Sequence, residues 1–399
     1  MWRKSGWIML GASLILALSL GIRHGFGLFL PPMSAEFGWG REVFALAIAL
    51  QNLIWGLTQP FTGAIADRFG AQRTVIIGGV LYALGLVLMG FADSLWSLSL
   101  SAGLLIGMGL SATSFSVILG VVGRAVAVED RSMAMGIASA AGSFGQFAML
   151  PGTLGLISWL GWSSALLALG LLVALIVPLA KMIKDAPLPA QVGDQSLLEA
   201  LHEASTHSGF WLLALGFFVC GFQVVFIGVH LPAYLVDQHL PALVGTTVLA
   251  LVGLFNIFGT YTAGWLGASR SKPRLLSALY LARAVVIGAF IWMPLTVWSA
   301  YAFGIAMGLL WLSTVPLTNG TIATMFGVRN LSMLGGIVFL FHQLGAFLGG
   351  WMGGYLYDQT GNYDLVWQIS IGLSLIAAAL NWPVREQPVA RLQTIPAAI

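Results

Sequence analysis

The chain has 399 residues, of which 58% are hydrophobic and only 8% are charged. Soluble globular domains carry about 25% charged residues, so this composition excludes an ordinary soluble protein and indicates membrane spans. Cys220 is the only cysteine, which excludes a disulfide scaffold and a cysteine zinc cluster. The net charge of +3 does not indicate a nucleic-acid partner, because membrane topology accounts for the basic excess.

Apolar runs long enough to cross a bilayer follow one another along the chain, separated by short polar breaks. A spanning helix needs about 20 apolar residues. The first run is too long for the apolar core of a signal peptide, so we interpret it as a retained helix. Twelve spans are predicted, at about residues 7–32, 43–66, 74–92, 95–122, 132–156, 160–183, 209–235, 244–267, 275–295, 298–325, 332–356 and 363–383.

A polar stretch in the middle of the chain divides the spans into two groups of six. It predicts an N-terminal six-helix bundle over 1–183, a cytoplasmic linker over 184–208, and a C-terminal bundle with a short cytoplasmic tail over 209–399. Within the linker, leucines recur on one side of residues 196–204, which indicates a short surface helix.

Lysine and arginine residues gather on one side of the predicted membrane. With the amino terminus inside, all 17 except Arg23, Arg41 and Arg283 fall on the cytoplasmic side. Arg41 lies outside, and the other two lie within spans. The positive-inside rule therefore predicts a multi-pass protein of the cytoplasmic (inner) membrane, with both termini in the cytoplasm.

The two halves match each other at a nearly constant offset of 200 or 201 residues. The matching pairs include Ser132 and Ser332, Met133 and Met333, Gly136 and Gly336, Gly63 and Gly264, and Arg73 and Arg274. Because each copy has six helices, both have the same topology and are related by an axis along the membrane normal. The predicted fold is an all-α membrane protein with twelve transmembrane helices in two pseudo-symmetric bundles, which enclose a substrate site near the midplane.

The loop after the second span reads Gly63-Ala-Ile-Ala-Asp67-Arg68-Phe-Gly70-Ala-Gln-Arg73. It resembles the signature loop of the major facilitator superfamily, Gly-x-x-x-Asp-Arg-x-Gly with trailing basic residues, and the resemblance extends over the whole chain. It implies the major facilitator fold, and a gating role for these residues in cytoplasmic contacts that hold one state of the alternating-access cycle. The alternative is a solvated turn that only orients the protein.

The second copy of this loop lacks the acid, because Ala268 and Ser269 stand where Asp67 and Arg68 do. This difference argues against a symmetric second gate.

Two further stretches, 25–41 and 342–350 with 357–364, resemble the oxalate:formate antiporter and monocarboxylate porter branch of the superfamily. That branch holds a carboxylate with cationic side chains on the central helices of its second half. Here His342 lies at about mid-depth, but the span 244–267 has no lysine or arginine. Arg283, in the next span, is a candidate second cation, with structural pairing to neighbouring helices as the alternative.

Arg23 lies deep within the first span, where an arginine costs about 2.5–3.5 kcal/mol on insertion scales. It is therefore a candidate anion-binding residue, with structural pairing or snorkelling as the alternatives. Other polar or aromatic side chains at plausible mid-depth are candidate substrate contacts, although each alone is more often inter-helix packing. Together with Arg23 and His342, the candidate set contains Asn52, Gln146, Gln223, Asn256, Trp311 and Gln343.

No aspartate or glutamate lies at mid-depth in a predicted span, since Asp364 is at the outer edge of the last one. Ion-coupled carriers commonly bind their ion at an intramembrane carboxylate, and exporters of cations use one for charge pairing, so an anionic substrate is favoured. His24 and His342 are the only mid-span groups that titrate near neutral pH, so exchange or uniport is favoured over proton symport.

No phosphate-binding loop and no nucleophile–base arrangement is present, which excludes ATP-driven transport and argues against an enzyme. We therefore predict a monomeric secondary active or facilitative transporter of a small organic anion, most simply a mono- or dicarboxylate, without cofactor or metal. An exporter of larger amphipathic compounds and a non-transporting receptor with a carrier fold are the alternatives.

Overall fold

The computed structural model describes residues 2–39, 41–183 and 195–393, and this part of the chain is helical without a strand. The elements of the first half are α1 (Trp2–His24), η1 (Phe26–Phe29), α2 (Leu30–Phe37), α3 (Arg41–Phe69), α4 (Ala71–Met89), α5 (Leu95–Leu98), η2 (Ser99–Leu105), α6 (Ile106–Thr113), α7 (Phe115–Ala125), α8 (Arg131–Ala174) and α9 (Ile176–Leu179). Those of the second half are α10 (Leu197–Thr206), α11 (Ser208–Asp237), α12 (Ala242–Ser269), α13 (Lys272–Trp292), α14 (Val297–Leu310), α15 (Thr314–Phe326), α16 (Leu331–Thr360), α17 (Asp364–Asn381) and α18 (Ala390–Gln393).

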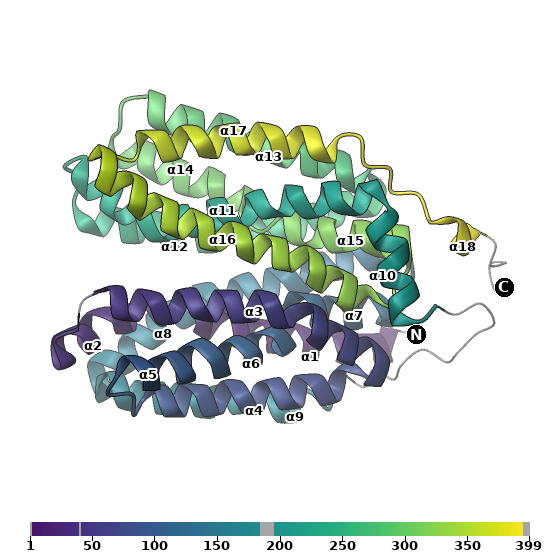
Figure 1. The fold of residues 1–399 in the computed structure, drawn as a ribbon, viewed down its shortest axis with the longest axis horizontal. Coiled ribbons are helices and arrows are strands. Elements are labelled where there is room, and N and C mark those ends of the chain that lie inside the picture. Colours follow the sequence, from purple (N-terminus) through teal and green to yellow (C-terminus); the bar gives the residue numbers. More distant parts are fainter. Residues whose placement is uncertain (1, 40, 184–194, 394–399) are drawn as a thin grey trace.

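The helices form two bundles that lie side by side, α1–α9 in one and α11–α17 in the other (Figure 1). Among the described residues, ten helices are long and apolar enough to cross a membrane. One of them, Arg131–Leu179, holds the fifth and sixth predicted spans, which are divided at Gly161, where φ is +77°. The second predicted span corresponds to α3, whose hydropathy is lowered by Gln51, Asn52 and Gln59. The helices thus account for the twelve predicted spans.

Four spans that we predicted as single helices are broken, among them the sixth, where α8 ends at Ala174 and α9 begins at Ile176. The first is interrupted at Gly25, the fourth contains a π-helical segment (η2) and a break at Ser114, and the tenth is interrupted between Leu310 and Thr314. Backbone groups freed inside a membrane must find partners within the protein, because lipid offers none. Breaks of this kind therefore mark places where side chains take over the role of backbone partners.

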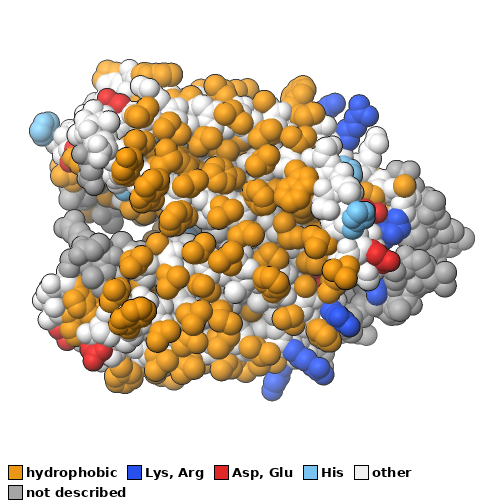
Figure 2. All heavy atoms as spheres, in the orientation of Figure 1, with side chains coloured by type: hydrophobic (Ala, Val, Ile, Leu, Met, Phe, Trp, Pro, Cys, Tyr) orange, Lys and Arg blue, Asp and Glu red, His pale blue; other side chains and the backbone are white. Residues whose placement is uncertain are grey.

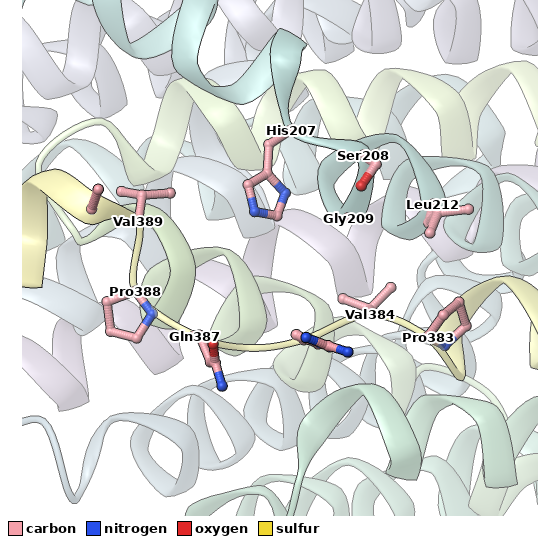
Figure 3. Close-up of a pocket in the computed structure, with 11 residues that line it drawn as sticks. His207, Ser208, Gly209, Leu212, Pro383, Val384, Gln387, Pro388 and Val389 are labelled. Carbon is pink, nitrogen blue, oxygen red and sulfur yellow. The ribbon is translucent and has the colours of Figure 1, made fainter.

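The surface helix predicted over 196–204 is present as α10, which begins at the Ser196 cap. The remainder of the linker prediction, residues 184–194, lies outside the described residues. The chain after α17 passes below the start of α11 (Figure 3), where the amide of Val389 donates to the Met325 carbonyl. Arg391 pairs with Glu203 of α10 at 3.4 Å. The start of α11 and the C-terminal segment line a cavity of about 470 Å³ here.

The two bundles meet along α3 with α16 and along α8 with α12. Their closest approaches lie towards the end that carries the termini. A Cβ atom on Gly63 would stand 2.3 Å from the carbonyl oxygen of Ser332, and one on Gly136 would stand 2.7 Å from the Cα of Gly264. Lysine and arginine side chains gather at this end, and the surface is hollowed between the two halves at the other (Figure 2). The bundles are therefore joined from mid-depth to the terminal end.

Candidate functional site

Arg23 forms the centre of a polar group between the two bundles. Its Nη2 donates to Oδ1 of Asn52 at 2.6 Å, and its guanidinium carbon lies 5.5 Å from the ring centre of Trp55. Gln343 of the other bundle donates through Nε2 to the carbonyl oxygen of Asn52 at 3.3 Å, and lies 3.5 Å from its Oδ1. Asn52 therefore links the arginine on α1 to α16 across the interface.

The location of Arg23 follows from the break in the first span. It occupies the last turn of α1, where a positive charge is stabilised by the negative end of the helix dipole. Gly25 permits the break and a close approach to α8, since a Cβ atom there would lie 3.0 Å from Oγ1 of Thr153. In the described part of the chain, Nε of Arg23 is buried without a hydrogen-bond partner.

His342 continues the polar group into the second bundle. Its Nδ1 lies 3.2 Å from Oε1 of Gln343, and its ring stacks on Phe339 with centroids 5.2 Å apart. Phe339 in turn contacts the Trp55 ring at 5.0 Å. Trp55 of the first bundle and Phe339 of the second thus connect the arginine to the histidine through ring contacts.

Gln146 and Asn256 belong to the second interface, between α8 and α12. Asn256 donates through Nδ2 to Ser143 Oγ at 2.9 Å and accepts the amide of Leu312 through Oδ1 at 2.9 Å. It therefore bonds to the other bundle and to the break in the tenth span at once. Gln146 faces Gly253 across this interface, and its Oε1 is buried without a partner among the described residues. An acceptor left open there is available to a hydroxyl or amide group of a ligand.

Arg283 supports the broken tenth span from within the second bundle. It is fully buried and donates to the carbonyl oxygens of Leu310 and Trp311, the first at 2.6 Å. It also donates to Gln223 Oε1 at 3.1 Å and contacts the sulfur of Cys220 at 3.7 Å. The candidate contacts Gln223 and Trp311 are therefore partners of Arg283, and the structure does not bring them to Arg23. Arg283 uses its donors on protein acceptors, as structural pairing requires.

The second candidate region lies at the terminal end of the bundle interface. Asp67 is buried, forms a 2.7 Å ion pair with Arg124 of α7, and accepts the amide of Met333 at 2.8 Å through its other oxygen. Met333 is in the first turn of α16, where amides have no intrahelical partner and the dipole is positive. Gly63, one turn before Asp67, is needed for the close contact with Ser332.

The remaining loop residues have other surroundings. Arg68 and Arg73 are exposed, and the Arg68 guanidinium lies over the ring of Phe69 at 5.2 Å. Gly70 has φ +91°, a conformation that favours glycine, and it begins the sharp turn into α4. Sequence reasoning missed Arg124 as the partner of Asp67. Its place at the same end of the fourth span, opposite in charge to Asp67, is the signal that pointed to it.

A family model described as the Major Facilitator Superfamily matches residues 9–322 of this chain. The chain belongs to the Major Facilitator Superfamily. The similarity that the Gly63–Arg73 loop indicated is thereby confirmed, and the chain is a multi-pass membrane transporter of a small molecule rather than an enzyme.

Curated relatives include members named for monocarboxylates. Human monocarboxylate transporter 11 is 28% identical over 386 residues, which cover 93% of this chain and 81% of the relative. Rat monocarboxylate transporter 13 is 28% identical over 94% of this chain and 87% of the relative. An uncharacterized superfamily transporter of Bacillus subtilis (strain 168), YcxA, is 25% identical over 93% of both chains. The expected resemblance to the monocarboxylate branch is confirmed.

Solved structures agree on the fold. A single-residue variant of the Escherichia coli fucose:proton symporter FucP superposes with a TM-score of 0.71 at 16% identity, covering 94% of this chain and 97% of that one. FucP in an outward conformation superposes with a TM-score of 0.70 over the same shares. The predicted fold of twelve helices in two bundles is confirmed.

Proposed function

We propose that this transporter carries a small organic anion, a mono- or dicarboxylate, by alternating access around Arg23. The observation that carries the proposal is the arginine itself, held between the bundles by neutral partners. Asn52 and Trp55 fix the position of the guanidinium but supply no counter-charge. A cation within a membrane span is costly without an opposite charge, and a substrate carboxylate would supply it. The names of the curated relatives support the same substrate class.

Substrate contacts beyond Arg23 would come from both bundles. Gln343 and His342 lie on the same polar group as Arg23, and Gln146 has an open acceptor on the facing interface. We infer that a carboxylate pairs with Arg23 while the rest of the substrate contacts the aromatic rings. The buried Arg283 would then act by stabilising the tenth span rather than by binding substrate.

The proposal also includes the orientation of the chain in the membrane and the way in which transport is coupled. We infer that the termini, which lie at the same end of the molecule (Figure 1), are cytoplasmic, in the inner membrane. The structure is then closed to the cytoplasm and hollowed towards the outside, and Gly63, Asp67 and the amino end of α16 form the closed gate. Because no carboxylate lies at mid-depth in a predicted span, exchange or uniport is favoured over proton symport. Each chain contains a full bundle pair, so we propose that it works as a monomer.

Counterflow into proteoliposomes loaded with single labelled mono- and dicarboxylates tests the proposal. Exchange should occur with at least one of them. Arg23→Gln should weaken its apparent affinity by about 10- to 100-fold, because a hydrogen bond to a charged group contributes about 1.5–3 kcal/mol. Arg23→Lys should retain part of it, and Arg68→Gln, which removes an exposed charge, should change nothing. Unaltered affinity in a folded, inserted Arg23→Gln protein would reject the site.

A further inference from the structure

The terminal end of the structure contains the second copy of the Asp67 gate, and its charged residues are missing. Offsets of 200 or 201 residues relate Asp67 to Ala268 and Arg124 to Thr324. Gly120 and Gly320 correspond in the same way. In the first copy the ion pair occupies the space between α3, α7 and the start of α16. In the second copy a methyl group and a hydroxyl replace the carboxylate and the guanidinium.

A cavity of about 260 Å³ is present where the second ion pair would be. Both bundles line it, with Ser132 and Arg131 from the start of α8 and Ala268, Lys272 and Thr324 from α12, α13 and α15. A phosphate-sized group fits this space, since one water takes up about 30 Å³ of liquid volume. The cavity therefore replaces the inter-bundle contact that Asp67 makes in the first copy.

A hydroxyl group with an unused hydrogen-bond donor faces this cavity. Ser132 lines it, has only 4% of its surface exposed, and its Oγ has no hydrogen-bond partner among the described residues. Ser132 and Met133 belong to the first turn of α8, where amides are free of intrahelical bonds and the dipole is positive. In the first copy the amide of the equivalent residue, Met333, is satisfied by Asp67. Ala268 offers no acceptor side chain to the Met133 amide.

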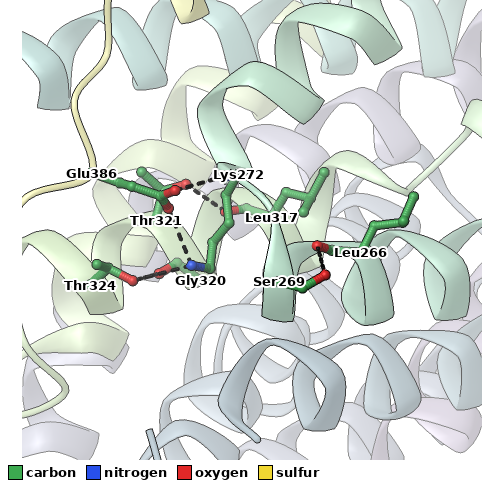
Figure 4. Close-up of polar contacts among 8 residues, drawn as sticks. All are labelled: Leu266, Ser269, Lys272, Leu317, Gly320, Thr321, Thr324 and Glu386. Atoms are coloured by element: carbon green, nitrogen blue, oxygen red, sulfur yellow. Dashed lines mark hydrogen bonds and ion pairs between the residues drawn. The ribbon is translucent and has the colours of Figure 1, made fainter. Parts of the chain in front are cut away.

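A cation reaches the same space from α13. Nζ of Lys272 lies 3.4 Å from Oγ1 of Thr324, so it comes to the residue that corresponds to Arg124 (Figure 4). A Cβ atom on Gly320 would lie 3.0 Å from Cδ of Lys272 and 3.9 Å from Oγ of Ser132, so both side chains lie around this glycine.

Other charges lie near the cavity. Glu386 accepts from Lys272 at 3.2 Å but is not among the cavity-lining residues. Arg131 and the exposed Glu129 also line the cavity, and Nε of Arg131 donates to the Gly123 carbonyl. Two cations and one carboxylate therefore face the space, together with the Ser132 hydroxyl.

We propose that this cavity, formed by Ser132, Ala268, Lys272 and Thr324, is a second anion site, separate from the transport site, that takes a phosphate-type oxyanion from the cytoplasmic side. The oxyanion would accept hydrogen bonds from Ser132 and the first turn of α8, as the Asp67 carboxylate does from α16. Because the lining comes from both bundles, occupancy stabilises the closed cytoplasmic end. Free phosphate and the phosphate of an anionic lipid headgroup share this chemistry.

Titration of the purified full chain with inorganic phosphate in an uncharged detergent tests the site, with sodium chloride at matched ionic strength as the blank. Phosphate should bind saturably and raise the thermal unfolding midpoint. Ser132→Ala should weaken binding at least fivefold. Ser332→Ala, the matched change in the first copy, should leave phosphate binding as in the parent. Ala268→Asp, at an exposed position, should abolish the response because it supplies the missing carboxylate.

A second experiment distinguishes free phosphate from a lipid headgroup as the ligand. In nanodiscs without free phosphate, phosphatidylglycerol should raise the unfolding midpoint over phosphatidylcholine, and lose that effect in Ala268→Asp, if the headgroup is the ligand. A response to free phosphate alone would assign the site to a soluble anion. Absence of both responses, or equal responses in the parent and Ala268→Asp proteins, would overturn the proposal, whatever the transport assays show.

Discussion

Substitution of Asp67 by asparagine is the sharpest test of the proposed cytoplasmic gate. The pair with Arg124 joins α3 to α7 within one bundle, so it persists when the bundles part. Opening breaks the bond from the Met333 amide to the carboxylate, which runs from one bundle to the other. A charge-assisted bond contributes about 1.5–3 kcal/mol and a neutral one about 0.5–1.5 kcal/mol. The substitution also removes the interaction of the carboxylate with the helix dipole, which contributes about 0.3–1 kcal/mol. Together, the two losses destabilise the closed state by about 2 kcal/mol relative to the open state.

This energy corresponds to about a 30-fold change in the ratio of closed to open molecules, enough to turn a 97:3 mixture into about 1:1. Spin labels on cysteines at the exposed positions Phe69 and Ser269, one on each bundle, would measure the distribution of distances across this end. The native Cys220 is buried and can remain.

Asp67→Asn should broaden that distribution towards long distances and slow turnover, with a smaller effect on substrate affinity. Arg68→Gln, an exposed neighbour, is the matched control and should leave it unchanged. Loss of the buried charge next to Arg124 should also lower the unfolding midpoint, because breaking a buried pair costs about 3–5 kcal/mol. A lowered midpoint with an unaltered distance distribution would refute the gating role and leave a purely structural one.

Three further changes have expected outcomes. Gly63→Ala places a methyl group 2.3 Å from the Ser332 carbonyl and should favour the open cytoplasmic end in the same distance measurement, whereas Gly228→Ala, which meets nothing within 4 Å, should not. Arg283→Met should lower the yield of folded protein and the unfolding midpoint by leaving two buried carbonyls unsatisfied, at about 1–3 kcal/mol each; a normal midpoint would contradict its supporting role. Uptake should not respond to an imposed proton gradient, and a response that His342→Gln abolishes would establish proton symport instead.

Hydropathy and charge distribution predict most of the fold. Long apolar runs define the spans, and their order and the 200-residue repeat predict two bundles. The breaks at Gly25 and between Leu310 and Thr314 were not predicted, because hydropathy averages over about 20 residues and a short interruption in an apolar run leaves the average high. Such a break is stable only when a distant group takes its free carbonyls. Arg283, 27 residues before Leu310, is such a group.

The candidate site was less predictable, because sequence gives the depth of a residue more readily than the direction it faces. Arg23, Asn52 and Gln343 share a depth and also face one another. Gln223 was selected by the same criterion but points into its own bundle, to Arg283. Which side of a helix faces the partner bundle depends on tertiary packing, and α11 is apolar on nearly all sides, so its pattern carries little directional information.

The shared acceptor on Asn52 has a consequence for exchange. Its Oδ1 lies 2.6 Å from the Arg23 guanidinium and 3.5 Å from the Gln343 amide, so the arginine holds the better bond and the opposite bundle the weaker one. An incoming carboxylate would compete with Asn52 for Arg23. Oδ1 of Asn52 would then be free to form a shorter hydrogen bond with Gln343. The strength of the contact between the two bundles at mid-depth would therefore differ between loaded and empty carriers. An exchanger must not reorient while it is empty, so it needs such a difference between its loaded and empty states. Here the Asn52 side chain would couple binding at Arg23 to the contact with the second bundle.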